Sequence, residues 1–341
     1  MRILVLGGTK FVGPHVVRNL AEHGHDVTIF HRGQTETELP PSVRHVHGDF
    51  INFSDHVRTL RNIKPEVVLD MVPFHEEDAQ RVKAFKGVAR RAVVISSGDV
   101  YRAFGRIWRT EPGDPDPVPL TEDSPLRQKL THAGLDYNKT AVERAVMDDP
   151  ELPVTILRLP ATHGPGDAQH RLHQYIKRMD DGRPAILLDE VHAAWRWARG
   201  YVEDVAYAIV LAVMNERAAG RTYNVCYPVA FTEVDWVKKI TQVIGWKGQV
   251  IALPAQRLPE SLRNETLDLR QQYDVDSGRI RRELGYAEVV SFDEALRRTI
   301  EWERANPPEN VDPEQFNYNA EDAVLSRLQA SLDSKPGPFE I

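Results

Sequence analysis

The sequence has few cysteines and no long apolar run, and both absences narrow the classes of protein that it can encode. Its 341 residues include one cysteine, Cys226, which excludes a disulfide framework and any zinc or iron–sulfur site built from several cysteines. No apolar run approaches the roughly 20 residues that a membrane-spanning helix needs. The apolar start of the chain, the run 2–6 with Arg2 at its head, leads directly into Gly7 and Gly8 and is too short for a signal peptide. We therefore expect a cytoplasmic protein without a membrane anchor.

An excess of positive charge is also lacking. The chain has 43 Lys and Arg residues against 50 Asp and Glu residues, which gives a net charge of −7. An acidic protein is a poor candidate for sequence-independent binding to nucleic-acid phosphates. Hydrophobic residues make up 41% of the chain and charged residues 27%, an ordinary balance that supplies a sizeable core. This composition favours a soluble protein that handles a small molecule and makes a nucleic-acid partner unlikely.

Short apolar runs alternate with amphipathic segments in the first half of the chain. Helical periodicity covers 12–23 and 137–147, and apolar residues of the first helix recur on one face. Near-continuous Val, Ile and Leu strands separated by helices indicate a parallel sheet that is covered on both faces. The sequence therefore predicts an α/β fold with a Rossmann-type, doubly wound parallel sheet. The expected strands are 2–6, 26–30, 43–47, 66–70, 92–96 and 153–158.

The alternation loosens after Arg158, and the second half predicts a smaller α+β portion. We expect an NAD(P)-binding Rossmann domain over 1–170, a substrate-binding portion over 171–305, and a polar C-terminal tail over 306–341 that wraps the surface or is mobile. A long stretch rich in Pro, Asp and Arg, 102–135, is typical of a lid or binding loop. The expected elements of the second half are helices at 203–214, 233–244 and 292–304 and strands at 186–188, 222–226 and 249–253.

A glycine-rich turn joins the first predicted strand to the first predicted helix. Gly7 permits the tight turn, Gly13 lets the helix pack closely on the strand, and the helix N-terminus offers free N–H groups to a pyrophosphate. Lys10 stands where a middle glycine is common, and its ammonium either reaches a phosphate or is solvated. The turn predicts a bound dinucleotide. Its expected contacts are Gly7, Thr9, Lys10, Phe11, Val12 and Gly13.

The end of the second predicted strand bears on the choice of dinucleotide. An acidic residue at this place would bind the ribose 2′-hydroxyl of NAD, but the sequence has His31 and Arg32. The planar guanidinium of Arg32 suits a 2′-phosphate, so NADP is favoured and NAD remains the alternative. We expect both residues to contact the cofactor. The opposing interpretation is that Arg32 is only a solvated loop charge.

The motifs taken together resemble the extended short-chain dehydrogenase/reductase family, and specifically its NAD(P)-dependent epimerase/dehydratase branch. The resemblance covers residues 1–304. The glycine turn looks like the family's phosphate turn, in a variant also seen in chloroplast stem-loop RNA-binding relatives. The run Ser96-Ser97-Gly98-Asp99-Val100-Tyr101 resembles the fifth-strand motif, and Arg158-Leu159-Pro160 resembles the crossover into the substrate portion.

The resemblance implies roles for individual residues. Ser97 aligns with the catalytic serine or threonine that also contacts the substrate, and Lys139 with the catalytic lysine. The family also implies a homodimer that pairs through two helices of the sheet domain, one of them 137–147. Further residues would line the cofactor, with Asp49 at the adenine. They are Asp49, Met71, Val72, Pro73, Ser96, Lys139 and Pro160.

The catalytic tyrosine is not at its usual place. Hydride chemistry at a carbinol needs a proton acceptor, and a tyrosine serves when a neighbouring ammonium lowers its pKa. The tyrosine normally precedes the lysine by four residues, on the same helix face, but that position is Leu135. The nearest tyrosine is Tyr137, two residues before Lys139 and on the opposite face of a regular helix.

Three interpretations of this gap stay open. In the first, Tyr137 lies in the first turn of the helix, turns inward and is the catalytic tyrosine. In the second, another residue has taken the proton-transfer role, and the candidates are Tyr101, His132 and His163. In the third, hydride chemistry is lost and the protein binds a dinucleotide without turning it over.

Arginines and tryptophans point to the substrate. Arginine suits phosphate, and Arg196 and Arg199 are the preferred contacts to a diphosphate, while Trp108, Trp195 and Trp197 stack on a sugar or base or are ordinary packing. No metal site is predicted, because His163, His170 and His173 have neither an acidic partner nor a cysteine to complete one.

The sequence thus favours an NADP-linked enzyme that acts on a nucleotide-activated or phosphorylated sugar by epimerisation, dehydration or reduction, through transient hydride transfer. The alternative is a dinucleotide-binding regulatory or RNA-associated protein with a degenerate active site, which Leu135 motivates. The net charge of −7 weighs against the RNA-associated form.

Overall fold

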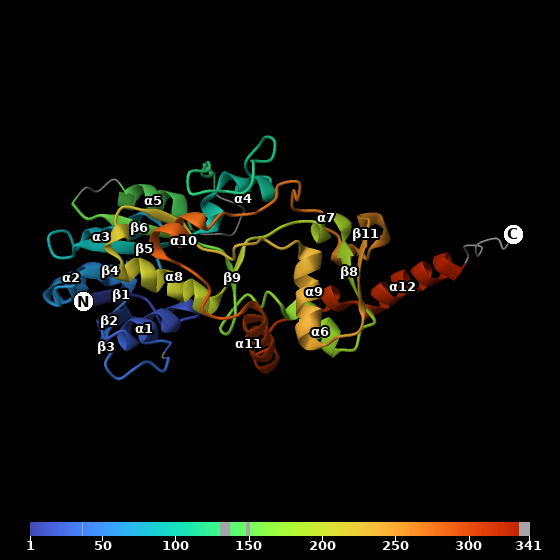
Figure 1. Ribbon diagram of the computed structural model, residues 1–341, viewed down its shortest axis with the longest axis horizontal. Coiled ribbons are helices and arrows are strands. Elements are labelled where there is room, and N and C mark those ends of the chain that lie inside the picture. The colour runs from blue at the N-terminus through green and yellow to red at the C-terminus, as the bar shows by residue number, and fades with distance from the viewer. Residues whose placement is uncertain (36, 130–136, 148–150, 334–341) are drawn as a thin grey trace.

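The computed structural model describes residues 1–35, 37–129, 137–147 and 151–333, which Figure 1 shows as a coloured ribbon. Its main sheet has seven parallel strands in the order β10-β6-β5-β4-β1-β2-β3. The six strands expected in the first half all lie in it, so the predicted Rossmann-type α/β fold is confirmed. The strands are β1 (Arg2–Leu6), β2 (Asp26–His31), β3 (Arg44–His47), β4 (Val67–Asp70), β5 (Arg91–Ser97), β6 (Val154–Leu159) and β10 (Thr222–Asn224).

Helices cover both faces of this sheet because its strands carry apolar side chains on both sides. Alternate residues of a strand face opposite ways. Val5 therefore packs toward α1 (Val12–Glu22) and α8 (Val202–Met214), whereas Leu4 packs toward the helices of the other face. The sheet is doubly wound, as predicted, and the carboxyl ends of its strands form the edge where such folds bind ligands. The helices of the other face are α2 (Phe53–Asn62), α3 (Ala79–Lys83) and α5 (Lys139–Met147).

The smaller α+β portion lies to one side of the main sheet, on the right in Figure 1. It contains two short parallel pairs, β8 (Ala185–Asp189) with β11 (Gln249–Leu253) and β7 (Ala161–His163) with β9 (Arg199–Tyr201). Over the described part of the chain, no helix is both long and apolar enough to cross a membrane. The remaining helices of the second half are α6 (His173–Asp180), α7 (Glu190–Ala193), α9 (Glu233–Ile244), α10 (Gly278–Leu284) and α11 (Phe292–Ala305).

Residues 202–224 return to the main sheet. Helix α8 packs against α1, and β10 pairs with β6 at the edge of the sheet. The chain therefore passes from the sheet into the smaller portion and back again. The divisions 1–170, 171–305 and 306–341 stay predictions.

The stretch expected to form a lid or binding loop, 102–135, is described up to residue 129. It begins with α4 (Arg102–Ile107). The carboxylate of Asp116 accepts hydrogen bonds from Arg102, and its backbone N–H donates to Oε1 of Gln271 at 2.5 Å. These contacts fix the described part of the stretch against the C-terminal half.

Of the polar tail, the described residues up to 333 pack partly on the molecule, and their far end projects outward in Figure 1. Helix α12 (Tyr318–Asp333) places Val324, which is 2% exposed, in a core cluster with Leu187 and Leu253. Arg178 of α6 donates to Oε1 of Glu321 at 2.8 and 3.0 Å. Both side chains of this ion pair are buried. Of the two expectations for the tail, wrapping of the surface describes this part.

The Arg178–Glu321 pair predicts how strongly α12 is held. Glu321→Ala leaves the Arg178 guanidinium buried without its counter-charge, and removal of one partner of such a pair costs about 3–5 kcal/mol. We expect a lower urea midpoint and faster proteolysis after residue 305. Asp322→Ala is the control, because its pair with Arg183 is half-exposed and worth much less. Equal effects of the two substitutions would contradict the prediction.

Candidate active site

The glycine turn after β1 has the geometry of an anion cradle. Gly7 and Gly8 have φ values of +92° and +94°, which L side chains rarely adopt. A Cβ on Gly13 would lie 2.6 Å from the backbone of Gly8, so no side chain fits there. Helix α1 begins at Val12 with no side-chain cap. The Gly13 N–H donates to the Lys10 carbonyl at 2.9 Å and Pro14 has no N–H, so the helix start offers a ligand the Val12 N–H and the positive end of its dipole. The turn therefore fits a pyrophosphate.

The other residues of the turn that the sequence predicted as cofactor contacts differ in their exposure and packing. The hydroxyl of Thr9 lies 3.2 Å from that of Thr35, whereas Lys10 is exposed to solvent. Phe11 has φ +50° and lies against the backbone of Gly166. Val12 packs in the core, so only its backbone faces the turn. The cradle is thus mainly a backbone structure.

The carboxyl ends of β2 and β3 lie side by side. His31 is 4% exposed and its Nε2 lies 2.9 Å from Nδ1 of His45, while the next residue, Arg32, is exposed. Asp49 lies just beyond β3, and its Oδ1 accepts a hydrogen bond from the N–H of Ile51 at 3.0 Å. His31, Arg32 and Asp49 therefore border the same end of the sheet, as the sequence predicts.

The end of β4 carries a buried carboxyl group. Asp70 is 1% exposed, and burial raises its pKa to about 6, although the charge of Arg81 opposes this shift. Oδ1 of Asp70 accepts a hydrogen bond from the N–H of Val72 at 3.0 Å. This bond sets the turn through Met71, Val72 and Pro73 at the carboxyl edge of the sheet.

Lys139, the first residue of α5, points back toward β4 and β5. Its Nζ donates to the backbone carbonyls of Pro73 at 2.8 Å and Ile95 at 3.3 Å, and lies 4.8 Å from the ring centre of Phe74. Burial lowers the pKa of Lys139, and the nearby carboxylate of Asp99 partly offsets that effect. The ammonium is thus held by main-chain oxygens at the centre of the site.

Asp99, Ser97 and Tyr137 form a cluster beside that lysine. The hydroxyl of Tyr137 donates to Oδ2 of Asp99, and Oγ of Ser97 accepts from the Asp99 N–H at 3.3 Å. Burial raises the pKa of Asp99. Burial also raises the pKa of Tyr137, and the charge of Asp99 adds to it. Tyr137 therefore turns inward, but in this arrangement it is a hydrogen-bond donor and a poor base.

A buried arginine lies against the same tyrosine. Arg127 is 1% exposed, and its Cζ lies 6.0 Å from the ring centre of Tyr137. Its Nη1 donates to the carbonyl of Lys129, but Nε and Nη2 have no hydrogen-bond partner, and neither has Oδ1 of Asp99. Unsatisfied buried polar groups are costly. This cluster can therefore accept a polar ligand atom.

Ser96 and Tyr101 belong to a buried polar network. The hydroxyl of Ser96 donates to Glu143 at 2.5 Å, and Glu143 pairs with Arg158 at 2.8 Å. The Tyr101 hydroxyl donates to Asn224 at 2.6 Å and accepts from Arg158 at 3.0 Å. Burial raises the pKa of Tyr101 to about 12. Both hydroxyl groups are thus engaged inside the protein, and Tyr101 is not placed for proton transfer.

The two histidine candidates for the missing base, His132 and His163, gain no support from the structure. His163 is 1% exposed between the hydroxyls of Thr299 and Tyr227, at 3.0 and 3.1 Å, and burial lowers its pKa to about 3. His132 and Leu135 lie outside the described residues. The sequence predicted no role for Asp99, although this residue lies within the fifth-strand motif, residues 96–101.

A cavity of about 280 Å³ lies in the smaller portion. One of its lining residues is Ala161, which follows Pro160 in the chain. Arg199 lines it, donates to Glu233 and lies 4.6 Å from the ring of Trp236. Arg196 does not line it, and donates to the Ala230 carbonyl at 2.7 Å. Of the three tryptophans that the sequence suggested, Trp195 and Trp197 line this cavity.

Two sequence relatives resemble the chain over most of its length. A 2'-dehydrokanamycin reductase from Streptomyces kanamyceticus is 28% identical over 274 residues, which cover 77% of this chain and 72% of the relative. A dTDP-glucose 4,6-dehydratase from Salmonella typhimurium is 24% identical over 350 aligned residues, which cover 90% and 93% of the two chains. The relatives carry out different reactions, so they do not identify one for this chain.

A solved structure shows the same fold. It is a UDP-glucose-4-epimerase from Stenotrophomonas maltophila with bound NAD and formylated UDP-arabinopyranose. It superposes with a TM-score of 0.67 at 18% identity, over 89% of this chain and 98% of that one. The sequence model of the NAD dependent epimerase/dehydratase family matches residues 3–226, more than half of the chain. The protein therefore belongs to the NAD-dependent epimerase/dehydratase family, a branch of the extended short-chain dehydrogenases/reductases.

Proposed function

We propose that the protein is an enzyme that epimerises, dehydrates or reduces a nucleotide-activated sugar with a bound nicotinamide dinucleotide. The observation that carries the proposal is the cluster of buried Asp99 with half-buried Ser97 and Tyr137 at the carboxyl end of β5, on the sheet edge that also carries the glycine turn. The dinucleotide, when bound, accepts and returns a hydride. The names of the dehydratase and epimerase relatives support the substrate class.

The dinucleotide fits the residues that border the sheet edge. The backbone of 7–13 would receive the pyrophosphate, since it leads into the N-terminus of α1, which has no side-chain cap, and has no room for a side chain at Gly13. Asp49 would contact the adenine. The remaining residues proposed to line the cofactor are Met71, Val72, Pro73, Ser96, Lys139 and Pro160.

We infer a preference for NADP from the end of β2. Arg32 is exposed, and no hydrogen bond or ion pair engages it within the described parts of the chain. Its guanidinium is therefore available to a 2′-phosphate, with His31 beside it. The epimerase structure holds NAD, so the choice between the two dinucleotides needs a direct measurement.

Asp99 is the proposed acid and base. Oxidation of a carbinol removes a hydride from carbon and a proton from oxygen, and the Asp99 carboxylate would take that proton through the Tyr137 hydroxyl. Ser97 would hold the substrate oxygen. The raised pKa of Asp99 suits a group that must both accept and return a proton. Lys139 would keep positive charge beside the cluster.

The cavity of about 280 Å³ is the proposed site for the nucleotide part of the substrate. Trp195 and Trp197 offer aromatic surface, and Arg199 offers charge, although Glu233 already neutralises part of it. The position of Arg196 outside the cavity lining gives it less support as a diphosphate contact. The homodimer and the cytoplasmic location stay predictions.

A second function is favoured by one observation. The ammonium of Lys139 is held by two main-chain carbonyls and Tyr137 is bonded to Asp99, so the usual couple of tyrosine and lysine is not assembled. A protein that binds a dinucleotide without turning it over would tolerate this arrangement. The net charge of −7 does not support an RNA partner for it.

The proton-transfer proposal predicts the effect of Asp99→Asn. Loss of a general acid or base lowers turnover by about 100-fold or more, and the affinity for the dinucleotide should not change. Turnover is measured by chromatography of the products formed from dTDP-glucose and UDP-glucose, because a dinucleotide that returns its hydride shows no net change in absorbance. Asp114→Asn in an exposed loop is the control. If the wild-type protein bound the dinucleotide but turned over no sugar in the panel, the second function would be favoured.

The glycine turn predicts the effect of Gly13→Ala. A methyl group 2.6 Å from the Gly8 backbone must displace the turn, so we expect at least about tenfold weaker dinucleotide binding in a fluorescence titration. Gly24→Ala is the control, because a Cβ there meets no atom within 4 Å and its backbone also has a positive φ. Unchanged affinity in a folded Gly13→Ala variant would contradict the proposed cradle.

The cofactor preference predicts the effect of Arg32→Gln. Loss of a charge-assisted contact should weaken NADP binding about tenfold and leave NAD binding unchanged. Arg257→Gln, an exposed arginine of the smaller portion, is the control. Parallel titrations with both dinucleotides measure the ratio, and tighter binding of NAD by the wild-type protein would overturn the preference.

A further inference from the structure

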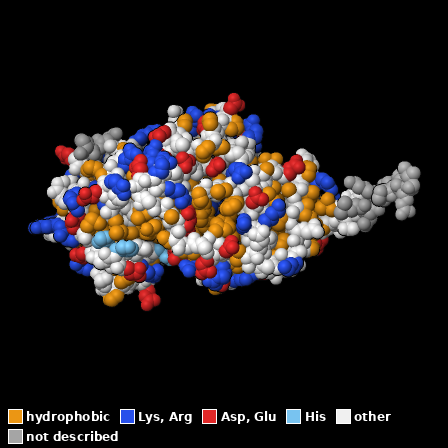
Figure 2. Space-filling view, in the orientation of Figure 1, with side chains coloured by type: hydrophobic (Ala, Val, Ile, Leu, Met, Phe, Trp, Pro, Cys, Tyr) orange, Lys and Arg blue, Asp and Glu red, His pale blue; other side chains and the backbone are white. Residues whose placement is uncertain are grey.

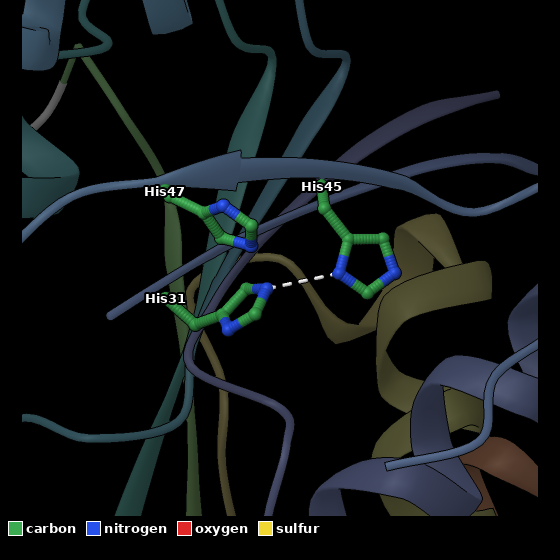
Figure 3. A group of neighbouring side chains, drawn as sticks. All are labelled: His31, His45 and His47. Carbon is green, nitrogen blue, oxygen red and sulfur yellow. Dashed lines mark hydrogen bonds between the residues drawn. The ribbon is translucent and has the colours of Figure 1, made fainter. Parts of the chain in front are cut away.

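Three histidines gather at the edge of the main sheet, outside the cluster of Ser97, Asp99 and Tyr137. His31 ends β2, and His45 and His47 lie on β3, the edge strand. His45 and His47 are two residues apart and therefore share one face of the strand. In the parallel register, His47 is the partner of His31. Figure 3 shows the three rings facing one another from the two strands.

The separations suit a single small cation. Nε2 of His31 lies 2.9 Å from Nδ1 of His45, and one nitrogen from each of the three rings lies within 4.8 Å of the others. Nitrogen ligands of one tetrahedral Zn²⁺, at 2.0–2.1 Å from the ion, lie about 3.3 Å apart. A shift of about 1.5 Å or less in the exposed rings would bring all three nitrogens into that geometry.

Burial divides the cluster into an anchor and two adjustable side chains. His31 is 4% exposed and is held in the packed end of β2, whereas His45 and His47 are exposed to solvent. Histidine side chains are visible at the surface of the sheet portion in Figure 2. An ion can therefore reach the cluster from solvent, and the two exposed rings can adjust around it without moving the core.

The hydrogen bonds of His31 show which proton an ion must displace. The backbone N–H of Gly33 donates to Nδ1 of His31 at 3.2 Å, so neutral His31 carries its proton on Nε2 and donates it to Nδ1 of His45. Binding of a metal at Nε2 moves that proton to Nδ1 and ends the long contact with Gly33. The lone pairs on Nε2 of His31 and Nδ1 of His45 then both face the ion.

Neighbouring charges do not block the site. Arg44 lies between Val43 and His45 and therefore faces the opposite side of β3, where it pairs with Asp26 at 2.5 Å. Arg32 follows His31 and is exposed to solvent. Imidazole ligands favour Zn²⁺, Ni²⁺ and Cu²⁺ over Mg²⁺ and Ca²⁺, which prefer oxygen ligands.

We propose that His31, His45 and His47 bind one divalent transition-metal ion of the zinc class. Three protein nitrogens leave a fourth coordination position for water or an anionic ligand. A bound ion would link the edge strand β3 to β2 through side chains as well as through the backbone ladder. The sequence predicted no metal site, but that prediction rested on His163, His170 and His173. These three residues lie elsewhere in the fold.

Equilibrium dialysis of the full chain against Zn²⁺ at pH 7.5, without dinucleotide, tests the proposal. We expect one bound equivalent, and at least tenfold weaker binding in both His45→Gln and His47→Gln. These variants replace exposed side chains, and their melting without metal should match that of the wild type. His23→Gln, an exposed histidine at the end of α1, is the control and should bind as the wild type does.

Substitution of Co²⁺ for Zn²⁺ gives a second readout, because a tetrahedral Co²⁺ site absorbs visible light far more strongly than the hydrated ion. Strong absorption that disappears in the variant carrying both His45→Gln and His47→Gln would support the site. Failure of the wild type to bind an equivalent, or unchanged binding in that double variant, would overturn the proposal. Neither measurement depends on enzymatic turnover, so each outcome is separate from the proposed function.

Discussion

The buried ion pair between Glu143 of α5 and Arg158 of β6 ties together the elements that carry the site, because Glu143 also binds Ser96 of β5. Each side chain is 5% exposed, and the guanidinium binds both carboxylate oxygens. Glu143 also accepts a hydrogen bond from the hydroxyl of Ser96, and Arg158 also donates one to the hydroxyl of Tyr101. Because Lys139 lies one turn before Glu143 on the same helix, the pair also sets how far the ammonium reaches between β4 and β5. A rigid shell of this kind orients groups that must not move during a reaction.

Burial has opposite effects on the charged groups at the carboxyl ends of β4 and β5. It raises the pKa values of Asp70 and Asp99 and lowers that of Lys139, because each charged form is poorly solvated. The groups partly stabilise one another, yet Asp99 and Arg127 keep unsatisfied polar atoms. Such a site has much to gain from a polar ligand, and clusters with these properties are frequent where proton transfer occurs.

The sequence was a good guide wherever a local rule decides the structure. Runs of Val, Ile and Leu located six parallel strands, and the glycine turn located the anion cradle, because both depend on neighbouring residues. The pairing of Tyr137 with Asp99 was not predictable, since 38 residues separate them and helix geometry alone placed Tyr137 on the wrong face. The histidine cluster likewise depends on the register of β2 and β3, which no local pattern contains.

The second half of the chain was harder to predict for the same reason. Strand β10 has three residues, and its apolar pattern indicates a strand but not a partner. Only the fold shows that it pairs with β6 across the intervening first segments of the smaller portion. The tail was expected to be simply polar, yet the face of α12 that carries Val324 packs into a core cluster.

The pairing of β10 with β6 has a consequence for how the molecule assembles. Residues 160–221, which include the first segments of the smaller portion, must be synthesised before the sheet gains its last strand. Closing so long a connection is slow because its entropy is spent before the contacts form. Until then β6 presents an open row of backbone donors and acceptors, the surface on which strands of other chains add. The stage at which this nascent protein most needs protection from aggregation is therefore the interval between completion of Leu159 and docking of Thr222.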